Sequence, residues 1–284
     1  MTVSIAAKRI GPGRLILISA ATAIAVLWLV PLILVIGASA KSAQQVSADG
    51  FFGLSGSLSQ LLENIAAVAE MTDLWLGFRN SVIYGVLGAG IAVLLSALAA
   101  YALVWLRVWR PFFWFMLIYS GTVFPFQMYM IPLSDWYKAT ALYDTRVGMT
   151  IFYVAICIPF CVFVLRSYYM GMPSEMFEAA KVDGASSLRI FTHIILPQSG
   201  SPAALLFLTQ FTWIWNDLLF GQVLAVSTEV RPIMPALALL AGANVTLGTV
   251  NERMAGALVA SLPALVLFLA LRNKFMQGFT LQLR

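Results

Sequence analysis

Residues 172–197 read MPSEMFEAAKVDGASSLRIFTHIILP, a long polar segment inside a chain that is otherwise strongly apolar. Ser174 suits a helix N-cap, and two glutamates follow it in the first turn, where the helix dipole favours negative charge. Gly184 is typical of a helix end, and Pro197 precedes the next apolar run. The pattern predicts a short exposed helix, a turn at Gly184, and a second helical stretch that leads into a membrane span.

The composition places most of the chain in a membrane. Hydrophobic residues make up 61% of the 284 residues and charged residues 10%, against about 45–50% and 25% in soluble domains. One core cannot hide that excess, so the sequence predicts an all-α, polytopic membrane protein. The net charge is +5. The positive residues lie beside apolar runs and form no basic patch interleaved with aromatics, so we expect membrane lipid as a partner and no nucleic acid.

Six apolar runs are long enough to cross a bilayer as helices, which takes about 20 residues each. The predicted spans cover residues 15–40, 81–106, 112–133, 147–165, 199–226 and 254–271. Asn216 and Asp217 interrupt the fifth span. An outer loop, 41–78, follows the first span, and the polar segment 172–197 follows the fourth, all within a single domain, 1–284. In the second span, three glycines and Ser96 predict a face on which another helix packs.

The first apolar run could instead be a signal peptide. Basic residues precede it, and Ala38-Ser39-Ala40 looks like a cleavage site. Its apolar part is longer than the about 7–15 residues of a signal-peptide core. We therefore expect an uncut span.

The charges predict which loops lie inside the cell. With six spans, one side of the membrane holds eleven positive and three negative residues, and the other side holds six positive and eight negative residues. Positive charge accumulates on the cytoplasmic side of membrane proteins. Both termini and the segment 172–197 are therefore expected in the cytoplasm.

Neither a metal site nor a catalytic site is predicted. Cys157 and Cys161 lie four residues apart in one apolar run, a helical spacing that seldom meets disulfide geometry. The chain has one histidine, and no third ligand lies near the cysteines. The serine, histidine and acidic residues lie on separate elements, so no nucleophilic triad is supported.

The polar segment resembles the EAA loop of ABC-importer permeases. That motif is Glu-Ala-Ala, three residues, Gly, nine residues, and Ile-x-Leu-Pro. The chain matches it without a gap at Glu178, Ala179, Ala180, Gly184, Ile194, Leu196 and Pro197. The alternative is an interfacial amphipathic helix that matches by chance. Spacing, predicted side and position before the last two spans all agree with the EAA loop.

The resemblance continues over about residues 81–280. The pieces resemble, in order, the sugar-permease branch typified by the maltose importer, the MalG-like subunits. They are Trp215-Asn216-Asp217, Arg231-Pro232-Ile233, Met254-Ala255-Gly256, Ser261-Leu262-Pro263 and Gly278-Phe279-Thr280. The first 78 residues match that branch only in layout, and the tail is shorter than in some relatives.

This resemblance implies a fold and a set of coupling residues. The implied fold is that of a type I ABC-importer permease with six transmembrane helices and a cytoplasmic coupling helix between spans 4 and 5. The ATPase-coupling role falls on Glu178, Ala179, Ala180, Asp183, Gly184, Ile194, Leu196 and Pro197. The implied location is the bacterial inner membrane, and the implied cargo is a sugar or oligosaccharide.

The implied partners are separate chains. They are a dimer of ATP-binding cassette subunits, a second, MalF-like permease, and an extracytoplasmic solute-binding protein. The sequence contains no Gly-x-x-x-x-Gly-Lys-Ser/Thr loop for phosphates. We therefore expect that this chain is not an enzyme and binds no cofactor, and that ATP and Mg are bound by the ATPase subunits.

Physical chemistry supports a coupling role for this segment. Glu178 can accept a charge-assisted hydrogen bond across an interface. Ala179 and Ala180 let two backbones approach closely, and Gly184 is expected to turn the chain where a Cβ would clash. A short helix anchored to two spans can convert closure of an ATPase dimer into rotation of those spans.

Trp215, Asn216 and Asp217 are candidate pore or gate residues. An acid inside a membrane span is a functional candidate, but Asp217 could also lie near the outer interface and pair with Asn216 or a facing subunit. Several aromatics could stack on sugar rings or belong to an interfacial belt. These are Phe124, Phe126, Tyr129, Trp213 and Trp215.

Two other classes of protein make different predictions. An ion-coupled secondary carrier requires paired charges near the membrane midplane and usually more spans, and Asp217 alone resembles that pattern. An intramembrane enzyme requires paired acids or a Ser/His set within the spans, which the sequence does not contain.

Overall fold

The computed structural model describes residues 12–53, 55–242 and 250–281, and all the regular elements in these ranges are helices. The confirmed fold class is therefore all-α. In chain order the elements are α1 (Pro12–Ser39), α2 (Ala43–Asp49), α3 (Leu58–Thr72), α4 (Leu74–Trp105), α5 (Pro111–Tyr119), the 3-10 turns η1 (Ser120–Thr122) and η2 (Phe126–Tyr129), α6 (Met130–Ala139), α7 (Arg146–Met170), α8 (Ser174–Val182), α9 (Ser187–Ile190), the π-helical turn η3 (Phe191–Ile195), α10 (Leu196–Gln198), α11 (Gly200–Trp215), α12 (Leu219–Leu224), α13 (Ile233–Gly242) and α14 (Val250–Leu281).

The chain forms two compact units, residues 1–68 with 244–259 and residues 69–243 with 260–284. In the first unit, polar side chains join the middle of α3 to the end of α1 and the start of α14. The buried amide of Asn64 on α3 donates to the carbonyl oxygens of Ser39 and Lys41 at the end of α1, at 2.8 and 2.9 Å. Asn251 of α14 donates to the Asn64 side chain. The predicted outer loop, 41–78, contains α2, α3 and the start of α4, so most of its helix lies in its later part.

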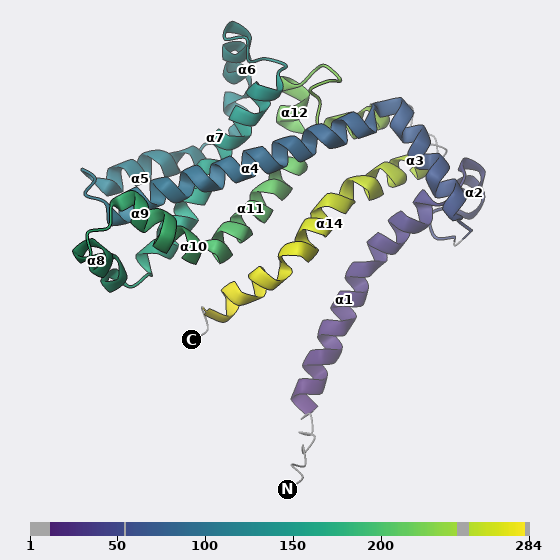
Figure 1. Ribbon diagram of the computed structural model, residues 1–284. Helices are drawn as coiled ribbons and strands as arrows, with labels where there is room; N and C mark the ends of the chain where they lie inside the picture. The colour runs from purple at the N-terminus through teal and green to yellow at the C-terminus, as the bar shows by residue number, and fades with distance from the viewer. Residues whose placement is uncertain (1–11, 54, 243–249, 282–284) are drawn as a thin grey trace. The chain divides into compact units, whose positions relative to one another are not determined.

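In the second unit, α4 packs along α7 and α11 (Figure 1). The helices approach closely because α4 carries glycine at the contacts. A Cβ on Gly85 would lie 2.7 Å from the ring of Phe211, and one on Gly88 would lie 2.8 Å from Ile214. Ser96 is also buried, and its hydroxyl donates to the Ile158 carbonyl. The predicted packing face on the second span is therefore confirmed for these residues.

Four of the helices in the described ranges are long and apolar enough to cross a membrane. They are α1, α4, α7 and α14, which correspond to the predicted first, second, fourth and sixth spans. Each is longer at one end or both than the sequence predicts. For example, α7 ends at Met170 rather than at residue 165, because Arg166 and the tyrosines beyond it continue the helix.

The predicted third span, 112–133, is wrong as one continuous helix. α5 ends at Tyr119, two short 3-10 turns follow, and α6 begins at Met130. Pro125 explains the interruption, because it has ψ 117° and has no N–H to donate to a helical hydrogen bond. The count of six spans stays a prediction.

The predicted fifth span, 199–226, is also two helices. α11 ends at Trp215 and α12 begins at Leu219. The carboxylate of Asp217 accepts hydrogen bonds from the backbone N–H groups of Phe220 and Gly221 at 3.3 and 3.0 Å. The acid therefore starts a new helix, as a side chain at an N-terminus does.

Candidate functional site

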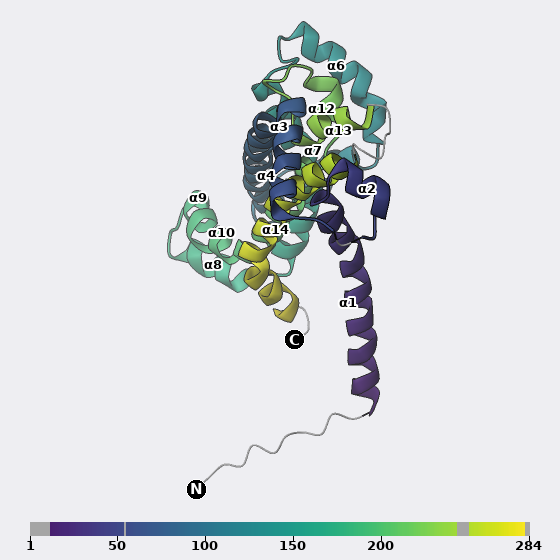
Figure 2. The same ribbon diagram turned by 90° about the vertical axis from the view of Figure 1, so that its right-hand side faces the viewer.

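The polar segment folds as a short helix, a turn and a second helical stretch, as its sequence predicts. Figures 1 and 2 show α8, α9 and α10 grouped together. The prediction of Ser174 as N-cap is wrong, because Ser174 is already the first helical residue of α8. Pro173 occupies the capping position with extended backbone, φ −60° and ψ 129°, and provides no side-chain cap.

Gly184 ends α8 in a Schellman motif. The N–H of Gly184 donates to the carbonyl of Lys181, and the N–H of Ala185 donates to the carbonyl of Ala180, both at 3.0 Å. This geometry requires a left-handed residue after the helix, and Gly184 has φ +78°. A Cβ at this position would meet no described atom within 4 Å. The expected clash is therefore absent within this chain, and the requirement for glycine comes from the backbone angle.

Aromatic side chains dock the polar segment on the end of α4. Phe177 is the buried residue of α8, and its ring centroid lies 5.0 Å from that of Trp105. Tyr101 lies between the two halves of the segment, with ring centroids 6.3 Å from Phe177 and 5.3 Å from Phe191. Its hydroxyl donates to the carbonyl of Ser187 at 2.9 Å. The segment is thus attached to α4 on both sides of its turn.

The end of α7 supplies a second attachment. The Tyr168 hydroxyl donates to the carbonyl of Gln198, and the buried Ser199 hydroxyl lies 3.0 Å from that of Tyr169. Sequence reasoning missed this whole set of aromatic anchors. The available signal was Phe177, the one aromatic residue of this short helix.

The eight predicted coupling residues divide between an exposed face and a docked face. Glu178, Ala179, Asp183, Gly184 and Pro197 are exposed. The half-buried members pack against the cluster around Tyr101 and are Ala180, Ile194 and Leu196.

The exposed face also carries apolar residues that the sequence analysis did not select. The Val182 side chain is 88% exposed and that of Leu188 is 67% exposed, on either side of Gly184. Glu178 forms no ion pair with any described residue. An exposed surface of mixed apolar and acidic residues on a firmly held helix is suited to a protein partner. His193 is exposed, with its Nδ1 2.8 Å from the Thr192 hydroxyl.

The three pore candidates take different positions at the break between α11 and α12. Trp215 is buried, and its indole N–H donates to the carbonyl of Ala260 at 2.8 Å. Asn216 is exposed, and its amide donates to the carbonyl of Thr212 rather than to Asp217. Asp217 is 8% exposed and accepts a 2.9 Å hydrogen bond from the Tyr153 hydroxyl. The pairing of Asp217 with Asn216 is therefore wrong.

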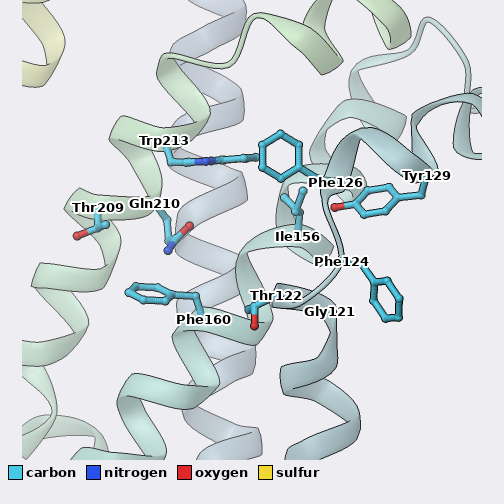
Figure 3. A pocket seen from close by; sticks show the side chains of 10 residues that line it. All are labelled: Gly121, Thr122, Phe124, Phe126, Tyr129, Ile156, Phe160, Thr209, Gln210 and Trp213. Carbon is cyan, nitrogen blue, oxygen red and sulfur yellow. The ribbon is translucent and has the colours of Figure 1, made fainter.

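A pocket of about 300 Å³ lies where α7 and α11 face the break between α5 and α6 (Figure 3). Four of the five aromatics that the sequence analysis considered line it, and Trp215 does not. The lining residues are Gly121, Thr122, Phe124, Phe126, Tyr129, Ile156, Phe160, Thr209, Gln210 and Trp213. No group of three potential metal ligands occurs in the part of the chain that the structure describes.

Comparison with known proteins places these features in a family. Residues 92–279 match the family model for the binding-protein-dependent transport system inner membrane component. A protein of Pyrococcus horikoshii named "Probable ABC transporter permease protein" is 39% identical over 164 residues, which are 58% of this chain and 59% of that protein. The lactose transport system permease protein LacG of Rhizobium radiobacter is 30% identical over 86% of each chain.

A solved structure agrees with the fold. A chain of a bacterial ABC transporter involved in the import of the acidic polysaccharide alginate superposes with a TM-score of 0.76 and 21% identity, over 92% of this chain and 97% of that one. Two thirds of the chain match the family model. The chain therefore belongs to the family of inner-membrane components of binding-protein-dependent transport systems, the permeases of ABC importers.

Proposed function

We propose that this chain is a permease subunit of an ATP-driven, binding-protein-dependent importer of a sugar or oligosaccharide. Residues 172–197 form its coupling segment. The observation that carries this proposal is the construction of that segment, in which α8 and α9 are docked on α4 through Phe177 and Tyr101 while Glu178 and Val182 face outward. A rigidly attached helix with a free outer face can receive a push from a partner and pass it to the spans.

The ATPase subunits contact the outer face of α8 in this mechanism. Val182 and Leu188 enter an apolar cleft of the ATPase, and Glu178 meets a basic or hydrogen-bonding group there. ATP and Mg are bound by the ATPase dimer, and its closure draws the coupling segments of two permeases together. This chain positions and gates without chemistry of its own.

The remaining partners follow from the family. A second permease, MalF-like, completes the pathway, and an extracytoplasmic solute-binding protein delivers the solute. The charge distribution supports a cytoplasmic position for both termini and for the coupling segment. LacG is named for lactose transport, which supports a sugar as the cargo.

No observation favours an ion-coupled carrier. Such a carrier requires charged pairs in the spans. Asp217 accepts hydrogen bonds from the Tyr153 hydroxyl and from backbone N–H groups at the start of α12. These hydrogen bonds give the carboxylate a structural role at the start of α12.

Cysteine cross-linking tests the coupling contact in the complete transporter. The background replaces the two buried cysteines, Cys157 and Cys161, by alanine. Val182→Cys should cross-link to the ATPase subunit with a yield that changes with nucleotide. Phe52→Cys, 79% exposed in the predicted outer loop, is the matched control and should give no such product. Absence of a Val182 product under every nucleotide condition would refute the coupling role.

A further inference from the structure

The pocket at the break between α5 and α6 has the features of a ligand site. Its volume of about 300 Å³ lies at the lower end of the range for small-molecule sites, which are lined mainly by apolar and aromatic side chains with a few polar groups. We propose that it binds one ring of a neutral pyranose sugar on its passage through the membrane. The proposal rests on the importer function and names the part of this chain that contacts the cargo.

Aromatic rings outside the pocket pack against the aromatic residues that line it. Phe126 lies edge-to-face with Trp213 at a centroid separation of 6.3 Å. Phe126 and Tyr129 each lie 6.0 Å from the buried ring of Phe220. Phe220 is fixed in turn by Phe152, 4.2 Å away. Packed aromatic rings present flat faces of fixed orientation, which suit the apolar C–H face of a sugar ring.

Asp217 contributes to the pocket as a positioning residue. Its carboxylate accepts the backbone N–H of Phe220 at the start of α12. This hydrogen bond places the ring that supports Phe126 and Tyr129. The break in the fifth predicted span and the break in the third therefore meet at one pocket wall.

Of the five polar side chains that line the pocket, the Thr122 and Thr209 hydroxyls already donate to backbone carbonyls of their own helical turns. Gln210 is 7% exposed, and Figure 3 shows its side-chain amide directed toward the pocket interior. Among the described residues this amide has no hydrogen-bond partner, nor has the Tyr129 hydroxyl or the Trp213 indole N–H. Buried polar groups are normally hydrogen-bonded. A ligand that carries hydroxyl groups would satisfy all three.

The charge of the lining selects among such ligands. None of the ten lining residues is charged. A carboxylate or phosphate would lose its hydration here without a cation to replace it, which is strongly unfavourable. A pure hydrocarbon would leave the Gln210 amide unpaired. A neutral sugar ring, with an apolar face and hydroxyls at its edge, fits both conditions. The cargo of the alginate transporter is acidic, so the pocket predicts a difference from that protein.

Ligand binding can be measured on the complete transporter complex by saturation-transfer difference NMR. The probes are methyl β-D-glucopyranoside, methyl β-D-galactopyranoside and the anion D-glucuronate. At least one glycoside should show saturation of its ring protons, and glucuronate should show much less. Gln210→Leu should weaken binding of that glycoside by about tenfold, the loss expected when a hydrogen bond to a buried amide is removed.

Two aromatic variants separate the pocket from general membrane binding. Trp213→Ala should abolish the signal, and Trp213→Phe, which keeps a ring and loses the N–H, should retain part of it. Trp114→Ala, in an exposed part of α5 outside the pocket, is the matched control and should bind as the wild type does. Equal binding by wild type and Gln210→Leu, stronger binding of glucuronate, or no saturation by either glycoside would each overturn the proposal.

ATP-dependent uptake in vesicles separates this proposal from the importer function. If wild type imports its solute while the glycosides fail to bind, the pocket is not a sugar site and the importer function stands. If the glycosides bind through Gln210 and Trp213 but no ATP-dependent uptake occurs, the site stands and the importer function fails.

Discussion

At the scale of single residues, the left-handed backbone angle of Gly184 is the sharpest constraint in the proposed coupling segment, 172–197. An L-residue with a Cβ is disfavoured at φ +78°, at a cost of roughly 1–2 kcal/mol, while asparagine tolerates this region better. The space around a Cβ built on Gly184 is open. Contacts within this chain therefore add little to the cost when the side chain at this position is larger. Any dependence on size must then come from a partner.

The cost of the backbone angle and the contact with a partner can be told apart by a series of substitutions at Gly184. Gly184→Asn should retain most ATP-dependent uptake, and Gly184→Ala should lower it through the cost of about 1–2 kcal/mol for a left-handed L-residue. Gly184→Leu should leave the protein inserted but lose coupling between ATP hydrolysis and uptake, because in the proposed complex the larger side chain would meet the ATPase. Uptake in vesicles and ATP hydrolysis are measured together. Equal effects of alanine and leucine would argue against a partner at this position.

At the scale of elements, the sequence predicts long helices better than their interruptions. α4 and α7 follow from long apolar runs without a charged residue, 81–106 and 147–165. The breaks in the predicted third and fifth spans depend on Pro125 and on the carboxylate of Asp217. A proline can kink a helix or end it, and the sequence alone does not distinguish the two results.

For the candidate site too, the sequence predicts the local features but not the long-range packing. The Gly184 turn and the exposed glutamates follow from local rules of helix capping and charge. The docking of Phe177 against Tyr101 and Trp105 joins residues that lie far apart in the sequence, and only the packed structure reveals it. The aromatic pocket needed the two helix breaks, which the sequence did not specify.

The docking of α8 gives a prediction at this scale. Removing a buried aromatic ring typically costs about 3–5 kcal/mol, so Phe177→Ala should release α8 from α4. We expect ATP hydrolysis by the complex to continue while uptake falls strongly, with Phe177→Leu intermediate. Phe112→Ala, at an exposed ring on α5, is the control and should transport normally. Normal uptake by Phe177→Ala would show that docking of α8 is not needed for coupling.

At the scale of the whole molecule, the two broken segments determine how many times the chain crosses the membrane. Irregular backbone is tolerated at membrane depth where it lines a cavity or is buried in protein. The break between α5 and α6 lines the aromatic pocket, and Asp217 at the other break is buried. Both segments therefore satisfy the condition for crossing, although only four described helices meet the criteria of length and composition as continuous spans.

Six crossings and four crossings place specific residues on different sides. With a cytoplasmic N-terminus, both arrangements put Phe52 outside. Six crossings put Trp136 outside and Val182 inside, whereas four crossings put Trp136 inside and Val182 outside. The positive-inside rule favours six, because Lys181 and Arg189 then lie in the cytoplasm.

Chemical labelling of single cysteines decides between six membrane crossings and four. Phe52→Cys, Trp136→Cys and Val182→Cys each replace a side chain that is more than half exposed, and each variant is treated in intact cells with a membrane-impermeant maleimide. With six crossings, Phe52→Cys and Trp136→Cys should react in intact cells, and Val182→Cys should react only after the membrane is opened. Reaction of Val182→Cys from outside together with protection of Trp136→Cys would establish four crossings. The coupling segment would then lie on the side of the membrane that lacks ATP, and the proposed mechanism would fail with it.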